Sequence, residues 1–257
     1  MNITEIKKRA REQIRPYIRN FVPVILIFIL IRCSIDTPNT ILKYLARKHP
    51  GDFGSISKIF NIVSALINAF ITPILTMAFL CLIAKIAKKK DDEEMPEISF
   101  KAFLSHFNMA GTAILNDLYT GLWLFIWALP IVLIYIFLGI GFSSVFSAYF
   151  SIVIFIIVLM AVIFYKCLSY YLNSYAIADD NETEVIEAMK ISKTITKGHI
   201  GELLLLDLSF IGWGLLSTLT LGIALIWVMP YMELSHFYAY QELVKASDSA
   251  DVKPLEE

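Results

Sequence analysis

Residues 59–84 read IFNIVSALINAFITPILTMAFLCLIA and contain no charged side chain. A helix needs about 20 predominantly apolar residues to cross about 30 Å of hydrocarbon. This stretch is longer than that minimum, so it predicts a membrane-spanning helix. Pro73 near its middle predicts a kink, with Thr72 or a neighbouring helix satisfying the freed carbonyl group.

The composition of the whole chain agrees with this prediction. Hydrophobic residues make up 57% of the chain and charged residues 18%, with a mean hydropathy of +0.66. Soluble domains are typically about 45–50% apolar and about 25% charged. The three cysteines, Cys33, Cys81 and Cys167, stand singly in or beside apolar runs, without the spacing of a disulfide framework or a zinc site.

The apolar stretches predict an all-α fold, a polytopic transmembrane helix bundle of about six spans with amphipathic surface helices. The predicted spans are 17–35, 59–84, 115–138, 149–171, 203–219 and 222–240. Residues 203–240 fit either two short spans, which we favour, or a re-entrant hairpin. Residues 36–55 contain two prolines and two glycines and are expected to form the external loop. Residues 1–245 are expected to form one membrane domain, followed by a disordered cytoplasmic tail at 246–257.

The first fifteen residues predict a basic amphipathic helix. Its apolar residues recur every three or four positions, and its cations recur every fourth position: Lys7, Arg11, Arg15 and Arg19. Such a helix is expected to lie flat on the membrane and to bind anionic lipid headgroups. Pro16 removes a backbone donor, so we expect a break there and the start of the next helix.

A second surface helix is predicted at 181–197, on the cytoplasmic side. Asn181 is expected to cap it, Glu184 stands three residues further on, and Gly198 is expected to end it. Of the 22 Lys and Arg residues, seventeen flank the spans on the side that holds both termini. Positively charged connections remain in the cytoplasm, so both termini are expected there, in a multi-pass protein of the plasma membrane.

Several segments of the last third resemble a known family. They are the runs 173–179 (NSYAIAD), 206–213 (LDLSFIGW), 219–223 (LTLGI) and 229–231 (MPY), with Glu187-Ala188, Ser192-Lys193 and Gly198-His199 between the first two. This pattern resembles the bacterial membrane proteins known as domain of unknown function 975. The resemblance implies a multi-pass plasma-membrane protein, common in Gram-positive lineages, with no settled activity. A looser similarity in layout to the membrane domain fused to some glycerophosphodiesterases implies lipid-related roles.

Few polar residues lie inside the predicted spans, so those that do are candidate site residues. Asp117 and Asp207 are expected at a similar cytoplasmic depth, with Lys166 and Asn173 as partners in a polar pocket. The alternative, which we favour, is that Asp207 only caps or pins the surface helix that ends at Gly198. Small residues at every fourth position predict a helix-packing face: Gly214, Thr218 and Gly222.

Three functions remain open. The first, which we favour, is a non-enzymatic scaffold or accessory protein of the envelope, and the second is a small transporter or lipid-handling protein with a polar intramembrane pocket. The third is an intramembrane enzyme that uses Asp117 and Asp207 as an acid–base pair, although no recognised motif surrounds either residue. No metal or other cofactor is expected, because the four histidines are scattered. Membrane lipids, including anionic headgroups, are the expected partners, and nucleic acid is not.

Overall fold

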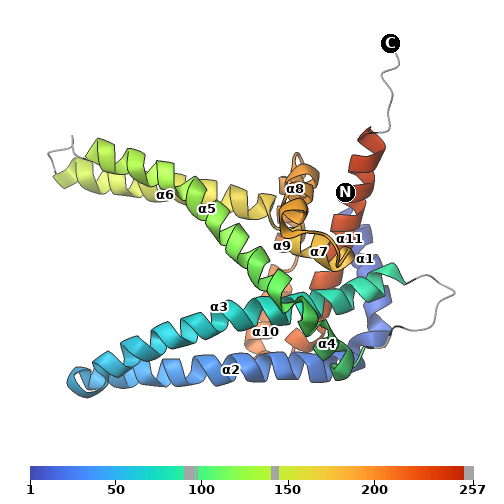
Figure 1. Ribbon diagram of the computed structural model, residues 1–257, viewed down its shortest axis with the longest axis horizontal. Helices are drawn as coiled ribbons and strands as arrows, with labels where there is room; N and C mark the ends of the chain where they lie inside the picture. Colours follow the sequence, from blue (N-terminus) through green and yellow to red (C-terminus); the bar gives the residue numbers. More distant parts are fainter. Residues whose placement is uncertain (90–95, 97, 140–144, 252–257) are drawn as a thin grey trace, which may run out of the picture. The chain divides into compact units, whose positions relative to one another are not determined.

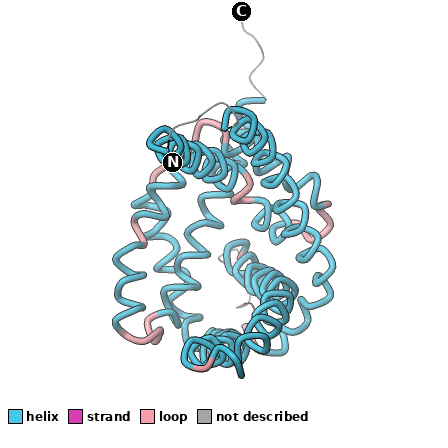
Figure 2. The backbone as a smooth tube through the Cα atoms, turned by 90° about the vertical axis from the view of Figure 1, so that its left-hand side faces the viewer, coloured by secondary structure: helices cyan, strands magenta, loops and turns pink. Residues whose placement is uncertain are grey.

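The computed structural model describes residues 1–89, 96, 98–139 and 145–251 (Figure 1). These residues form helices, turns and connections, and no strand occurs among them (Figure 2). The chain forms two compact units. Unit 1 contains Met1, Leu115–Asp207 and the chain from Tyr240 onward, whereas unit 2 contains Asn2–Ile114 and Leu208–Ala239.

Unit 2 begins with three helical segments in direct succession: α1 (Ile3–Ile14), a 3-10 turn (Arg15–Tyr17) and α2 (Ile18–Lys48). The break predicted at Pro16 is therefore confined to one tighter turn, which contains the proline. The amphipathic pattern of the first residues is confirmed, because Ile6, Ala10 and Ile14 are buried. These side chains are covered by protein, and the binding of lipid headgroups by the cations of this helix stays a prediction.

Helices α2 and α3 (Pro50–Lys88) lie side by side and antiparallel in unit 2 (Figure 1). The external loop predicted at 36–55 is wrong, since helix continues through these residues except at His49. Pro50 stands at the start of α3, where a missing N–H costs nothing. Three polar contacts join the two helices: Arg32 Nη1 to Thr72 Oγ1 (3.0 Å), Asn68 Nδ2 to Asp36 Oδ1 (3.1 Å) and Asn39 Nδ2 to Asn61 Oδ1 (3.2 Å).

The core of unit 2 is built around the second half of α3, where residues 77–84 are all buried. Phe79 packs on Phe21 of α2, with ring centroids 5.4 Å apart. Helix α4 (Phe100–Ser105) follows and buries Phe103, and a 3-10 turn (His106–Met109) leads into α5 (Ala110–Gly139). Helix α10 (Ile211–Leu219) and the first part of α11 (Leu225–Asp251) complete the unit.

Unit 1 contains most of α5, then α6 (Val145–Ser169), α7 (Asn173–Asp179), α8 (Val185–Thr196) and nearly all of α9 (Ile200–Leu208). Helices α5 and α6 lie close together at Tyr135 and Phe155, whose rings stack with centroids 4.2 Å apart. The connector predicted between them lies largely outside the described residues. The span predicted at 149–171 ends at a turn, 170–172, and is followed at once by α7.

Five stretches of the described chain are helical, long and apolar enough to cross a membrane. They are Ile3–Lys48, Phe53–Lys88, Phe100–Ile136, Ile152–Asp179 and Ile200–Leu219. Their exposed side chains include many large apolar residues, for example Leu66, Phe125 and Ile157. Exposing apolar faces of this size to water is unfavourable, so they are suited to contact lipid.

The sixth predicted span, 222–240, is not among these five. Residues 225–240 of it lie in α11, which carries Glu233 and His236 and buries Leu234, Phe237 and Tyr238 in protein. A helix of this composition is stabilised by packing more than by lipid. Helix α11 also continues to Asp251, so the disordered tail predicted at 246–257 is wrong for residues 246–251. Residues 252–257 lie outside the described residues.

Two local predictions also need correction. Helix α8 begins at Val185 with Glu184 in the N-cap position, so Asn181 does not cap it. Ahead of the helix, Asp180 Oδ1 accepts the Glu182 N–H at 3.0 Å and forms a turn. The packing face predicted at Gly214, Thr218 and Gly222 is interrupted, because α10 ends at Leu219. Gly222 lies in the following turn with φ +89°. A helical repeat cannot continue through a left-handed residue.

Candidate functional site

The carboxyl end of α6 is joined to α8 by buried hydroxyl groups in unit 1. Ser192 Oγ accepts the Leu172 N–H at 3.1 Å and donates to the carbonyl oxygen of Ser169 at 3.0 Å. Thr196 Oγ1 contacts the same carbonyl at 3.3 Å. The last carbonyls of a helix have no partner within it. The two side chains of α8, at most 1% exposed, therefore provide one.

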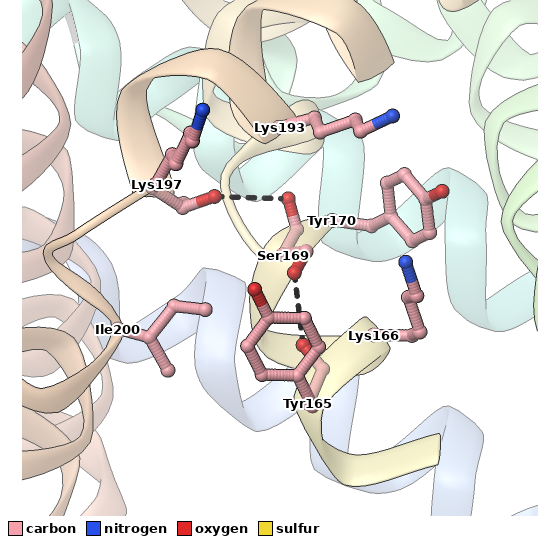
Figure 3. Close-up of a pocket in the computed structure, with 8 residues that line it drawn as sticks. Tyr165, Lys166, Ser169, Tyr170, Lys193, Lys197 and Ile200 are labelled. Atoms are coloured by element: carbon pink, nitrogen blue, oxygen red, sulfur yellow. Dashed lines mark hydrogen bonds between the residues drawn. The ribbon is translucent and has the colours of Figure 1, made fainter. Parts of the chain in front are cut away.

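This junction brings three lysines to one pocket of about 210 Å³. Lys166 lies in the last turns of α6, Lys193 lies in the last turn of α8, and Lys197 directly follows α8. Figure 3 shows Lys166 and Lys193 extending beside Tyr170, with Lys197 on the other side of Ser169. We call this site the lysine pocket, and its lining residues are Tyr165, Lys166, Ser169, Tyr170, Lys193, Thr196, Lys197 and Ile200.

The lysine pocket combines uncompensated positive charge with hydroxyl groups. Within the part of the chain that the structure describes, none of the three lysines forms an ion pair. Lys166 Nζ is held over the Trp127 ring, 3.6 Å from its centroid, which fixes its position without neutralising it. Positive charge also complements the negative carboxyl ends of α6 and α8. The pocket can therefore accept an anion, such as a phosphate group.

The structure does not bring the four residues of the predicted polar pocket to one cavity. Lys166 lines the lysine pocket, and Asp117, Asn173 and Asp207 do not. Asn173 Nδ2 donates to Thr120 Oγ1 at 2.9 Å, and Asp207 Oδ1 accepts from the Tyr171 hydroxyl at 3.2 Å. Asp117 is exposed on α5.

Other polar residues make a network that the sequence did not indicate. Asn116 Nδ2 donates to Ser174 Oγ at 3.1 Å, so two side chains of α5 contact α7. His199 Nδ1 lies 3.0 Å from Glu202 Oε2, as expected for residues three positions apart. Among the described residues, no group of three or more His, Cys, Asp or Glu side chains is placed to hold a metal ion.

Sequence reasoning named Ser192 and Lys193 only for the family resemblance and assigned no ligand to Lys193 or Lys197. Lysines in the last turn of a helix usually remain in solvent and complement its dipole. The signal that could have identified them was the pair of hydroxyl residues four positions apart, Ser192 and Thr196, on an otherwise apolar face. Only the contact with α6 shows what these hydroxyls bind.

Comparison with known proteins gives a family and nothing closer. The model of the family described as Protein of unknown function (DUF975) matches residues 1–247. The match extends well beyond the last third, where the sequence resemblance was specific. No curated protein and no solved structure matches the chain.

Proposed function

We propose that this chain, which belongs to the DUF975 family over residues 1–247, is an accessory protein of the plasma membrane. It binds a phosphate-bearing anion in the lysine pocket. Five helical stretches of the described residues are long and apolar enough to span a membrane. The lysine pocket provides a site at one end of such a helix, α6. This proposal adds a ligand to the scaffold role that we favoured from the sequence, and binding that ligand requires no catalysis.

The observation that supports this proposal is that Lys166 and Lys193 extend beside Tyr170 at a pocket that Lys197 also lines. Among the described residues, none of the three lysines forms an ion pair. Each ammonium group can donate up to three hydrogen bonds. Because like charges repel, an anion bound by Lys166 and Lys193 relieves the repulsion between them as well as forming contacts. A volume of about 210 Å³ is below the usual range of about 300–1,000 Å³ for ligand pockets. This size favours a phosphate or small phosphate ester.

The transporter and enzyme alternatives have less support. Both require Asp117 and Asp207 to act at one cavity. Asp207 contacts Tyr171, Asp117 is exposed on α5, and neither lines the lysine pocket. We therefore place these alternatives below the accessory role.

The test is ligand binding by the full chain purified in detergent. We expect phosphate, pyrophosphate and glycerol 3-phosphate to raise the unfolding temperature saturably, compared with chloride at equal ionic strength. Lys193→Ala should weaken binding about tenfold, since charge-assisted hydrogen bonds are the strong ones. Short-chain phosphatidylglycerol is titrated separately into the unaltered protein and into Lys193→Ala. A response that is weakened in Lys193→Ala would identify a lipid headgroup, not only a free phosphate ester, as a source of the anion at the lysine pocket.

Lys190→Ala is the matched control, because Lys190 is exposed on the same helix but does not line the pocket. It should bind phosphate as the unaltered protein does. An equal loss of phosphate affinity in Lys193→Ala and Lys190→Ala would show that binding depends only on general surface charge. No saturable response to any of the phosphates, or an undiminished response in Lys193→Ala, would refute the proposal.

A further inference from the structure

A second pocket, in unit 2, lies between the basic amphipathic helix and two aromatic helices. Its volume is about 320 Å³, and it is lined by Arg11, Glu12, Ile14, Arg15, Ile18, Trp213, Trp227 and Tyr231. We call it the arginine–tryptophan pocket. It includes two of the four residues predicted to bind lipid headgroups, together with two tryptophans to which the sequence assigned no ligand.

The spacing of these residues explains why they face one cavity. Arg11 and Arg15 are four positions apart along the chain, as are Trp227 and Tyr231 on α11. Residues four apart lie on the same face of a helix. Trp213, from α10, packs edge-on against Tyr231, with ring centroids 6.4 Å apart. The cavity thus has a cationic side and an aromatic side.

The basic helix is held in place by contacts on both sides of this cavity. Lys7 Nζ donates to Ser209 Oγ at 2.9 Å and lies 4.4 Å from the centroid of the Phe210 ring. Gln13 Nε2 donates to the carbonyl oxygen of Ile86 at 2.6 Å, and its Oε1 accepts from the Tyr238 hydroxyl. Arg11 and Arg15 are therefore carried on a helix that is fixed to its unit and does not need lipid to be ordered.

Tyr231 is the second observation that indicates a ligand. Its side chain lines the pocket, the residue is only 5% exposed, and its hydroxyl has no hydrogen-bond partner in the described part of the chain. Buried hydroxyl groups nearly always have a partner, because leaving one unsatisfied is costly. The guanidinium of Arg11 lies 5.8 Å from the centroid of the same ring. A bound acceptor would therefore meet a cation and a phenol together.

From this combination we infer that the arginine–tryptophan pocket binds one anionic phospholipid, with its phosphate at Arg11 and Arg15 and the start of its acyl chains against the tryptophans. Indole rings prefer the boundary between headgroups and hydrocarbon, where one part of the ring is apolar and the other is wet. Ile14 and Ile18 extend the apolar side of the cavity. A free phosphate would leave this side unused, whereas an amphiphile occupies both.

Binding of a single lipid differs from general attraction to a charged membrane. Surface attraction would involve every exposed cation of the basic helix about equally, at about 1 kcal/mol for each. A pocket makes Arg15, which lines it, different from Arg19, which is also exposed but does not line it. This pair of residues therefore distinguishes the two modes of binding, and neither residue lines the lysine pocket.

The experiment measures phospholipid bound to the full chain purified in mild detergent, before and after delipidation. After delipidation, we expect short-chain phosphatidylglycerol to rebind with one molecule per chain. Glycerol 3-phosphate and short-chain phosphatidylcholine should bind at least about tenfold more weakly at this site. Arg15→Ala should lose about tenfold in affinity for phosphatidylglycerol, whereas Arg19→Ala should lose little.

Tyr231→Phe provides an independent measurement, because it removes only the hydroxyl. We expect it to weaken phosphatidylglycerol binding while leaving the unfolding temperature of the delipidated protein unchanged or higher. Equal losses in Arg15→Ala and Arg19→Ala would show surface attraction only. Undiminished binding in both Arg15→Ala and Tyr231→Phe would overturn the inference, as would glycerol 3-phosphate binding as tightly as the lipid to a Lys193→Ala chain, in which the lysine pocket is weakened.

Discussion

At the scale of single residues, hydroxyl side chains position the candidate site. Ser192 is fully buried and makes two hydrogen bonds at the end of α6, one as donor to Ser169 within the helix and one as acceptor from Leu172 in the turn that follows. Thr196 gives the Ser169 carbonyl a second donor, but in the described structure Ser192 is the acceptor for the Leu172 N–H. Loss of the Ser192 hydroxyl would leave the Leu172 N–H without an acceptor, whereas loss of the Thr196 hydroxyl would leave the Ser169 carbonyl with Ser192 as a donor.

We expect Ser192→Ala to destabilise the protein by about 1–3 kcal/mol, because it leaves a buried N–H without an acceptor. The measurement is thermal unfolding of the full chain in detergent, together with phosphate binding at the lysine pocket. Thr194→Ala, at an exposed position of the same helix, is the control and should change stability little. If the two variants were equally stable, the junction between α6 and α8 would not depend on this hydroxyl.

At the scale of elements, the ends of helices decide where the charged residues lie. Helix α8 is followed by Lys197 in an extended conformation and by Gly198 with φ +87°. This left-handed residue reverses the chain and starts α9 two positions later, at Ile200. Residues other than glycine adopt this backbone conformation only at a cost in free energy. The position of Lys197 at the lysine pocket thus depends on the glycine that follows it.

Gly198→Ala should therefore destabilise the protein by about 1–2 kcal/mol. An added methyl group would meet nothing within 4 Å, so the whole cost comes from the backbone conformation. Gly201→Ala, within α9 and also in open space, should have the opposite sign, since alanine favours helix by about 0.5–1 kcal/mol. If Gly198→Ala and Gly201→Ala changed the unfolding temperature in the same direction, the explanation from backbone conformation would be contradicted.

At the scale of the whole molecule, orientation in the membrane follows from charge. The cytoplasmic location of both termini stays a prediction from the distribution of Lys and Arg. Five candidate spans raise a further question about Ile200–Leu219, which contains a turn at Ser209-Phe210 between α9 and α10. If this segment enters the membrane and returns, both termini are cytoplasmic, and if it crosses once, they are on opposite sides.

Cysteine labelling in intact cells separates these arrangements, in a variant whose three native cysteines are replaced. We expect Ser55→Cys, beside the connection between α2 and α3, to react from outside. Glu182→Cys and Ser249→Cys should react only after permeabilisation. Labelling of Ser55→Cys and Ser249→Cys together from outside would show that Ile200–Leu219 crosses once. Labelling of Glu182→Cys from outside, with Ser55→Cys protected, would invert the predicted orientation.

The sequence by itself determined the features that depend on local composition and period. Long uncharged runs such as 59–84 specify helices that suit lipid, because no other regular structure of a single segment satisfies its backbone there. The apolar positions of the basic amphipathic helix and the helix end at Gly198 follow from period and backbone conformation in the same way. The loop predicted from Asp36 and Pro38 onward is helical instead, because contacts between α2 and α3 stabilise the helix through these residues.

The tertiary structure alone decided which distant residues share a site. Lys166 and Lys193, or Arg15 and Trp227, are far apart in the chain, and no local pattern couples them. Their proximity depends on side chains that join one helix to another, at Ser192 in unit 1 and at Gln13 in unit 2. Of the predicted cluster around Asp207, only Lys166 lines the lysine pocket. Equal depth in a membrane does not bring side chains together unless their helices pack.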